Sequence, residues 1–189
     1  MKRTFCLLCF LIFGQTWVFA QMPRKENGMT AADRAVWFNK LKWDSQDALA
    51  SDQDRFENAG FKFISLNDRR WLVEIITGAG AYQFSYVFAI LDERFPKTVR
   101  SLTFTEYYLD EHNQVKRQRT RFLSGRSSFD RLTNTLQIYY KGRGIGDCGS
   151  LTTFKVLANP VRTVKSRLRS CDLASSDVPP EKWDKIRLW

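Results

Sequence analysis

The stretch WLVEIITGAGAYQFSYVFAIL, which runs from Trp71 to Leu91, decides the fold. Two runs rich in β-branched and aromatic residues, 71–77 and 82–91, flank the turn Gly78-Ala79-Gly80. β-Branched and aromatic residues favour strands, and closely spaced glycines mark a turn. The stretch therefore predicts two consecutive strands of an antiparallel sheet.

Segments of similar composition lie on both sides of this stretch. Alternation begins at Phe61 and Phe63, and turn residues such as Glu111-His112-Asn113 and Asn159-Pro160 separate the later runs. This spacing predicts an antiparallel β meander that closes toward a barrel or a sandwich. The further strands are expected at 99–109, 115–123, 132–140, 151–157 and 161–168.

Helical patterns lie before and after the strands, so the expected class is mainly β with α (α+β). Thr30-Ala31-Ala32-Asp33 resembles a capping box and predicts a helix from Ala31 to Lys42. A second short helix is expected over 45–58, ended by Gly60. The segment 177–189, with Pro179-Pro180 before Trp183, predicts a short helical cap at the C-terminal end.

The first twenty residues resemble a secretory signal peptide. Lys2 and Arg3 precede an apolar run, 5–13, that is too short to span a bilayer, and Val18-Phe19-Ala20 fits a cleavage site. We expect an exported chain that begins at Gln21, in the periplasm or secreted, with a loose lead-in at 21–29 and one domain up to 189. The alternative is a retained N-terminal anchor. No later stretch approaches membrane-spanning length.

Two cysteines, Cys148 and Cys171, remain after the expected cleavage. Exported proteins with two cysteines most often pair them. A bridge over this loop would stabilise the fold by about 3 kcal/mol on the chain-entropy estimate. The alternative is two free thiols.

The run Lys141-Gly-Arg-Gly-Ile-Gly-Asp-Cys-Gly149 holds four glycines in nine residues. Glycine is needed where the backbone has φ > 0 or where another group approaches it closely. One interpretation is a structural turn, in which Asp147 accepts hydrogen bonds from nearby backbone N–H groups. The alternative is an anion-binding turn, whose glycine N–H groups converge on a ligand oxygen. The structural turn would use Gly142, Gly144, Gly146, Asp147 and Gly149, and the anion site would use Lys141, Arg143, Gly144 and Gly146.

The same run formally matches the dinucleotide-binding fingerprint through Gly144, Gly146 and Gly149. That fingerprint requires a helix after the turn, so that the helix N-terminus faces a pyrophosphate. A strand-like segment follows here, so we reject a nucleotide site. We expect no cofactor.

The net charge is +10, and +8 without Lys2 and Arg3. Such a chain is attracted to anionic surfaces, or is simply soluble.

Residues two apart share one face of a strand, and two basic trios have this spacing. If their strands are neighbours, they form one patch that could bind a phosphate-rich partner. The alternative is two solvated faces. The trios are Arg117, Arg119 and Arg121, and Lys165, Arg167 and Arg169.

His112 is the only histidine, and it lies in an expected hairpin tip. A hydrolytic triad or a histidine metal cluster would depend on this one residue, so we expect neither a catalytic histidine nor a metal site. A pair of catalytic carboxylates forms in space, and no spacing in the sequence argues for one.

Three segments resemble a bacterial exported family, domain-of-unknown-function family 1176. The glycine-rich run resembles the family signature, 78–83 is similar to its Gly-Ala-Tyr turn, and 179–183 is similar to its Pro-Pro-x-x-Trp ending. The resemblance covers roughly 61–189. Relatives often carry cysteines near 43–47 and just before the Gly-Ala-Tyr turn, where this chain has none, which fits a lost disulfide. The resemblance implies the fold and the compartment, and no activity.

Two functions remain open at this point. The favoured hypothesis is a non-enzymatic binding or interaction module of the bacterial envelope. Its partner would be an anionic envelope component or another protein, rather than nucleic acid, and it would bind through the basic face or the glycine-rich turn. The alternative is a hydrolase of envelope carbohydrate or phosphoesters with a carboxylate site. A cleft lined by two or more acids would favour the hydrolase.

Overall fold

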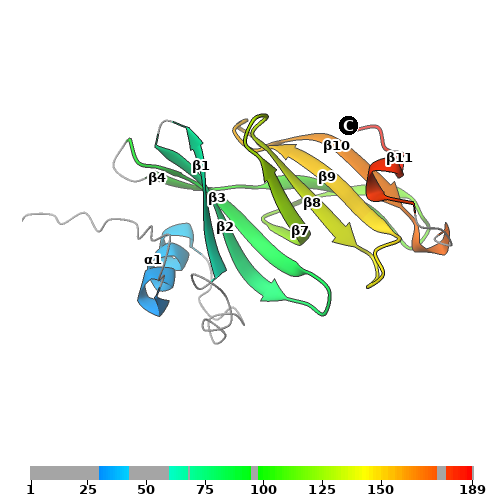
Figure 1. Cartoon of the computed structure of the whole chain (residues 1–189), viewed down its shortest axis with the longest axis horizontal. Helices are drawn as coiled ribbons and strands as arrows, with labels where there is room; N and C mark the ends of the chain where they lie inside the picture. The colour runs from blue at the N-terminus through cyan, green and yellow to red at the C-terminus, as the bar shows by residue number, and fades with distance from the viewer. Residues whose placement is uncertain (1–29, 43–59, 68, 95–97, 174–177, 189) are drawn as a thin grey trace, which may run out of the picture.

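The computed structural model describes residues 30–42, 60–67, 69–94, 98–173 and 178–188 (Figure 1). These residues form a mainly antiparallel β fold with one α-helix. The elements are α1 (Ala31–Leu41), β1 (Phe61–Asn67), β2 (Arg70–Ala79), β3 (Phe84–Asp92), β4 (Thr98–Ser101), β5 (Phe104–Leu109), β6 (Val115–Thr120), β7 (Phe122–Asp130), β8 (Thr135–Lys141), β9 (Gly149–Lys155), β10 (Arg162–Arg169), η4 (Cys171–Leu173), η5 (Pro180–Lys182) and β11 (Asp184–Lys185).

The strands pair mostly with their neighbours in sequence, as expected for a meander. The main sheet has the order β1-β2-β3-β7-β8-β9-β10-β11, and β4 joins it beside β3. β3 is the branch point, because its residues 84–87 pair with β7 and its residues 89–92 pair with β4. The sheet therefore divides into one part that carries α1 and another made of β7 to β11 (Figure 1).

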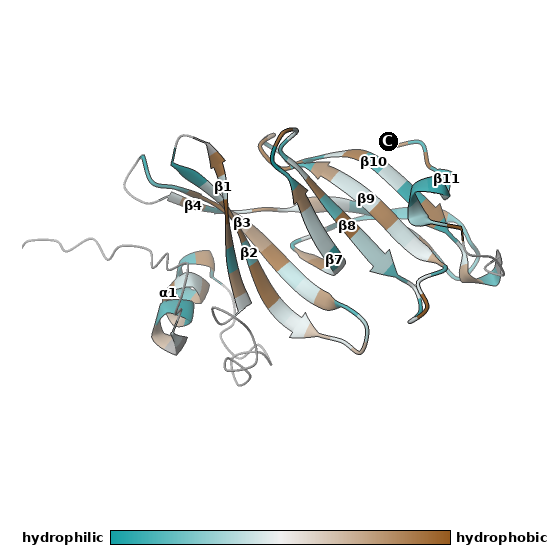
Figure 2. Ribbon diagram, in the orientation of Figure 1, coloured by the Kyte–Doolittle hydropathy of each residue, from teal (hydrophilic) through white to brown (hydrophobic). Residues whose placement is uncertain are grey.

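The part that carries α1 is buried on both faces around β2 and β3, where Figure 2 shows apolar residues. α1 begins with a capping box between Thr30 and Asp33. Its Trp37 is completely buried, and the ring lies 5.7 Å from that of Phe61. The Arg34 guanidinium lies over the Phe38 ring at 4.5 Å and donates to the Ile76 carbonyl. α1 thus covers the outer face of this sheet.

The opposite, inner face holds the larger core. Alternate residues of β3 reach it, and an aromatic chain continues from Tyr86 through Phe88 to Phe104 and Phe154. The Phe104 and Phe154 rings are 5.0 Å apart, and they join the β5–β6 hairpin to β9. Side-chain alternation along the strands explains how one strand supplies both cores.

β7 produces the bend between the two parts. Its residues 122–125 pair with β3, and its residues 126–130 pair with β8. The change of partner falls at Gly125, whose φ is +143°. A Cβ at this position would lie 2.5 Å from the Tyr139 carbonyl oxygen. The close approach of β8 therefore requires glycine here.

The predicted barrel closure is wrong. In the described part of the chain, the β5–β6 hairpin forms a separate two-stranded sheet. It lies beside β10, where the Thr163 hydroxyl donates to the Thr105 carbonyl at 2.7 Å, but it adds no ladder to β10. β5 and β10 are thus joined by a side-chain hydrogen bond without a backbone ladder, and the curved sheet is open at this edge.

Two predicted strands are broken by this arrangement. The segment 99–109 forms β4 and β5, which lie in different sheets, with buried Leu102 between them. The segment 115–123 breaks at Arg121, where β6 ends and β7 begins. The second half of β7, residues 126–130, has two adjacent serines and little strand signal of its own, and it forms through its pairing with β8.

The predicted C-terminal helical cap is reduced to the single 3-10 turn η5. The following residues form β11, which pairs with β10 at Arg167 and Leu168. The backbone is already extended at Trp183, whose side chain is buried, so the helix does not continue past Lys182. The predicted helix at 45–58, the signal segment and the lead-in lie outside the described residues.

We predict that Gly125→Ala lowers the free energy of unfolding by about 2 kcal/mol or more, because its positive φ and the Tyr139 carbonyl both oppose a side chain. Urea unfolding followed by circular dichroism measures the loss. Gly78→Ala is the matched control, since its Cβ would meet Ser85 at an ordinary 3.5 Å. Equal stability of the two variants would contradict the role of Gly125 in the bend.

Candidate functional site

The glycine-rich run forms the connection between β8 and β9, and a disulfide fixes it. Cys148 is completely buried and is bonded to Cys171, which begins η4 after β10. The predicted Cys148–Cys171 bond is thus present in the structure. It ties the turn between β8 and β9 to the end of β10, which is the next strand of the sheet after β9.

Each glycine of the turn meets a different neighbour. A Cβ at Gly142 would lie 2.8 Å from the Cys171 sulfur, and one at Gly144 would lie 2.8 Å from the Tyr82 ring. Gly146 and Gly149 have φ of +76° and +131°. A Cβ at Gly149 would also lie 2.1 Å from the Tyr140 carbonyl oxygen. The glycine density thus follows from local geometry.

The charged groups of the turn are engaged within it. The Arg143 side chain forms an ion pair with Asp147, and its Nε donates to Oδ1 at 2.8 Å. This hydrogen bond lowers the pKa of Asp147. The Lys141 ammonium donates to the Gly144 carbonyl at 3.3 Å. These contacts favour the structural interpretation of the turn over the anion-binding one.

The three segments that carry the family resemblance meet at this turn. Gln83, from the Gly-Ala-Tyr turn, accepts a hydrogen bond from the Lys141 N–H at 3.0 Å. The Tyr139 hydroxyl donates to the Gly146 carbonyl. The Trp183 ring packs edge-on against Tyr139 with 5.8 Å between centroids. Segments far apart in sequence therefore form one structural unit.

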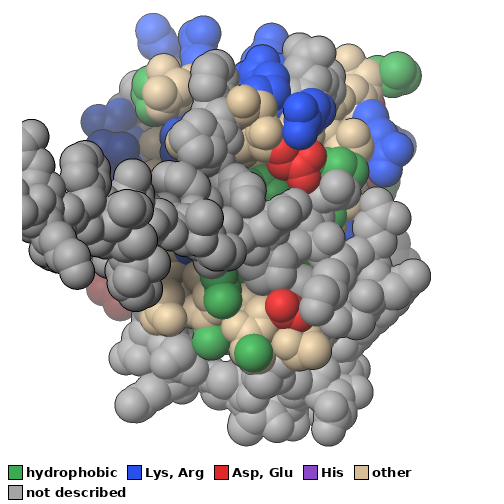
Figure 3. Space-filling model, turned by 90° about the vertical axis from the view of Figure 1, so that its left-hand side faces the viewer, with side chains coloured by type: hydrophobic (Ala, Val, Ile, Leu, Met, Phe, Trp, Pro, Cys, Tyr) green, Lys and Arg blue, Asp and Glu red, His purple; other side chains and the backbone are tan. Residues whose placement is uncertain are grey.

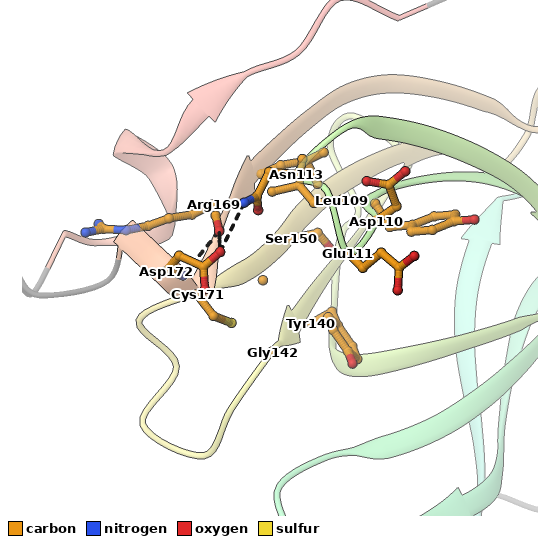
Figure 4. Close-up of a pocket in the computed structure, with 14 residues that line it drawn as sticks. Leu109, Asp110, Glu111, Asn113, Tyr140, Gly142, Ser150, Arg169, Cys171 and Asp172 are labelled. Carbon is orange, nitrogen blue, oxygen red and sulfur yellow. Dashed lines mark hydrogen bonds between the residues drawn. The ribbon is translucent and has the colours of Figure 1, made fainter.

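Beside this unit lies a half-open groove of about 320 Å³, between the β5–β6 hairpin and the sheet (Figure 4). Tyr108 of β5 and Tyr140 of β8 both line it, and they are 42% and 40% exposed. Leu168 of β10 is a buried part of the wall. The glycine-rich turn and the disulfide supply the rest of this side through Gly142, Gly149 and Cys171.

Three carboxylates line the groove, each in a different environment. Asp110 accepts from the backbone N–H groups of His112 and Gln114, and these bonds lower its pKa. Asp172 accepts from the Asn113 amide at 3.0 Å. The side chain of Glu111 is 86% exposed, with one oxygen 3.5 Å from the His112 ring. Sequence analysis did not identify this cluster, because Asp172 is about 60 residues away from the other two acids and joins them only in the folded chain.

Two further carboxylates were also missed. Glu74 lies in the apolar run of β2, and it accepts a 2.6 Å hydrogen bond from the Ser127 hydroxyl. Burial raises its pKa. Burial likewise raises the pKa of Glu106 on β5 to about 6, although Gln118 donates to it. The sequence signal for Glu74 is an acid between buried aliphatic residues.

The basic trios lie on separate sheets. Arg117 and Arg119 are on β6 and Arg121 follows its end, whereas Lys165, Arg167 and Arg169 are on β10. β5 pairs with β6 and contacts β10, so it separates the two strands. The strands are therefore not neighbours, which was the condition for one continuous patch.

Positive charge is also found elsewhere on the surface. Arg167 donates to the Trp183 carbonyl, so part of the β10 trio holds the C-terminal segment. Figure 3 shows the end that carries α1, where Lys and Arg side chains gather in the upper half of the view with an acidic side chain among them. The charge of the chain is thus not confined to β6 and β10.

Among the described residues, no group of three or more His, Cys, Asp or Glu side chains is arranged to hold a metal ion. No helix in the described part of the chain is long and apolar enough to cross a membrane.

The fold and the groove define a β-rich α+β domain with an open curved sheet, a disulfide-fixed turn and a tyrosine-lined groove. The chain belongs to the family described as "Protein of unknown function (DUF1176)", whose model matches residues 15–186. The resemblance inferred from the three segments is thereby confirmed. No curated protein and no solved structure matches the chain.

We predict that Gly146→Val lowers the free energy of unfolding by about 1–3 kcal/mol, because a β-branched residue tolerates φ of +76° poorly. Gly144→Val should cost less, since the ring it meets, Tyr82, is 64% exposed and can move away. Thermal unfolding measures both. Adding Tyr82→Ala should remove the cost of Gly144→Val and leave that of Gly146→Val. If Tyr82→Ala restored the stability of both variants, crowding by side chains, and not the backbone conformation of Gly146, would explain why glycine is needed at these positions.

We predict that Glu106 makes the domain less stable as the pH rises. Its folded pKa, about 6, lies above the ordinary value of 4.5, so the folded state holds the proton more tightly. This contribution is complete below pH 4.5 and is lost as the pH rises through about 6, for a total of about 1–2 kcal/mol. Urea unfolding between these pH values should show the decrease in wild type and a smaller one in Glu106→Gln. If the free energies of unfolding of wild type and Glu106→Gln changed with pH in parallel, the prediction would be wrong.

Proposed function

We propose that this chain is an exported, non-enzymatic binding module of the bacterial envelope that takes its ligand in the tyrosine-lined groove. One observation carries the proposal. Tyr108 and Tyr140 come from two different sheets, and each keeps about two fifths of its surface exposed where it lines a cavity of about 320 Å³. Ligand sites commonly combine aromatic walls with a few polar groups in a concave surface.

The rigid surroundings of the groove support binding. The disulfide fixes Cys171 and the glycine-rich turn along one wall, and the Asn113 amide holds Asp172. A wall that is already ordered loses little conformational entropy when a ligand binds. The disulfide is also compatible with an oxidising compartment, which agrees with the expected signal peptide and a periplasmic or secreted location.

The hydrolase alternative rests on the acids of the same groove. A glycosidase needs one carboxyl group that stays protonated near neutral pH and a second that is ionised. The pKa of Asp110 is lowered rather than raised. Glu106 has a raised pKa but is not among the residues that line the groove. The arrangement therefore favours binding over hydrolysis.

The test is a set of ¹⁵N-labelled NMR titrations of the mature chain, residues 21–189. The probes are soluble peptidoglycan fragments, lipopolysaccharide and duplex DNA. We expect at least one envelope component to shift the amide resonances of Ser150 and Asp172 saturably, and to be recovered uncleaved. Tyr108→Ala and Tyr140→Ala should each weaken this binding by about tenfold, the loss of one aromatic contact.

Phe122→Ala is the matched control, because Phe122 is 52% exposed and does not line the groove. It should bind like wild type. Cleavage of a probe that is abolished by Glu106→Gln or Glu111→Gln would replace the binding function with the hydrolase. Shifts confined to Arg117, Arg119 and their neighbours would move the function to the basic strands.

A further inference from the structure

The groove has a charge opposite to that of the chain. The chain carries a net +10, yet three of the four charged residues that line the groove, Asp110, Glu111 and Asp172, are acids, and the fourth is Arg169. Arg169 contributes to the lining, but its side chain extends away from the groove in Figure 4, and its charge helps to lower the pKa of Asp147 in the glycine-rich turn. The groove is therefore a local negative site on a positive molecule.

The three carboxylates do not contribute equally. Asp110 is held by the hairpin turn, and the Lys116 ammonium lies 3.4 Å from its Oδ2, which offsets its charge. Glu111 and Asp172 are exposed and stand on different sides of the opening (Figure 4). A group that enters the groove between them is therefore exposed to the field of two carboxylates.

An aromatic ring completes this environment. Tyr140 lies below Glu111 in the close-up (Figure 4). Tyr108 also lines the cavity and supplies a second ring. The face of an aromatic ring carries negative potential and attracts an ammonium group within about 6 Å. Rings and carboxylates thus favour a cationic group at this point, and a phosphate or carboxylate group placed there would be repelled by both.

We infer that the groove binds an alkylammonium group, presented by a small polyamine or by a lysine side chain. The inference rests on the proposed binding function and names the chemistry of its ligand. The ammonium would lie between Glu111 and Asp172, and its alkyl chain would lie along the tyrosine rings and Leu168. A cavity of about 320 Å³ accommodates one such chain.

The experiment titrates the mature chain with spermidine and, separately, with Nα-acetyl-lysine methylamide, and follows groove resonances by NMR. The neutral control ligand is the same lysine derivative acetylated on its side-chain nitrogen. Both amines, or one of them, should bind saturably, with an affinity that decreases as salt is added. Binding of spermidine alone identifies a free polyamine, and binding of the lysine derivative alone identifies a protein side chain.

Asp172→Asn and Glu111→Gln should each raise the Kd of the bound amine by about tenfold, since each removes one charge from the groove. Glu111 is almost fully exposed, so its variant keeps the fold even if Asp172→Asn disturbs η4. The matched control is Asp184→Asn, an exposed acid on β11 that does not line the groove, which should leave the Kd unchanged.

Three results would overturn the inference. The neutral derivative could bind as tightly as the amine, neither amine could shift the groove resonances, or Glu111→Gln and Asp172→Asn could leave the Kd unchanged. These results differ from a failure of the binding function. If an envelope component maps to Ser150 and Asp172 while both amines fail, the groove remains a binding site for a ligand of other chemistry.

Discussion

The change of partner along β7 is the constraint on which the rest of the structure depends. Because one half of β7 pairs with β3 and the other with β8, a single strand joins the helix-covered part of the sheet to the curved part. Gly125 permits the close approach of Tyr139 at this point. The resulting bend encloses the core around Phe88, Phe104 and Phe154, and it leaves space for the β5–β6 hairpin. The groove lies where this hairpin and the curved sheet diverge.

The family signature has a structural explanation that does not require it to bind anything. The disulfide, the Tyr82 ring and the backbone of β8 each exclude a side chain at one of the glycines, and Arg143 and Asp147 satisfy each other. The Gly-Ala-Tyr turn and the C-terminal tryptophan pack on the same unit. Gly142, Gly149 and Cys171 also form part of the groove wall. If the groove binds a ligand as proposed, the signature supports that site rather than supplying the groups that contact the ligand.

The sequence predicted features that depend on local patterns. Alternation located most strands, Thr30 and Asp33 indicated where a helix begins, and the count of cysteines gave the disulfide. Features that depend on long-range pairing were not accessible. The half of β7 that pairs with β8, residues 126–130, has little strand signal of its own. That β5 lies beside β10 without a backbone ladder is likewise a matter of long-range packing. The groove combines residues from four strands and a 3-10 turn, so no spacing along the chain could reveal it.

Net charge is a property of the whole surface, whereas recognition depends on the field inside one concavity. The sequence gives +10, and this value alone favours an anionic partner. The Debye length at physiological salt is about 8 Å, so distant lysines and arginines contribute little to the potential at a given point. Glu111 and Asp172 line the groove, and the side chain of Arg169, the one cation among the lining residues, extends away from it. The charge proposed for the ligand therefore follows from the local carboxylates rather than from the net charge of the chain.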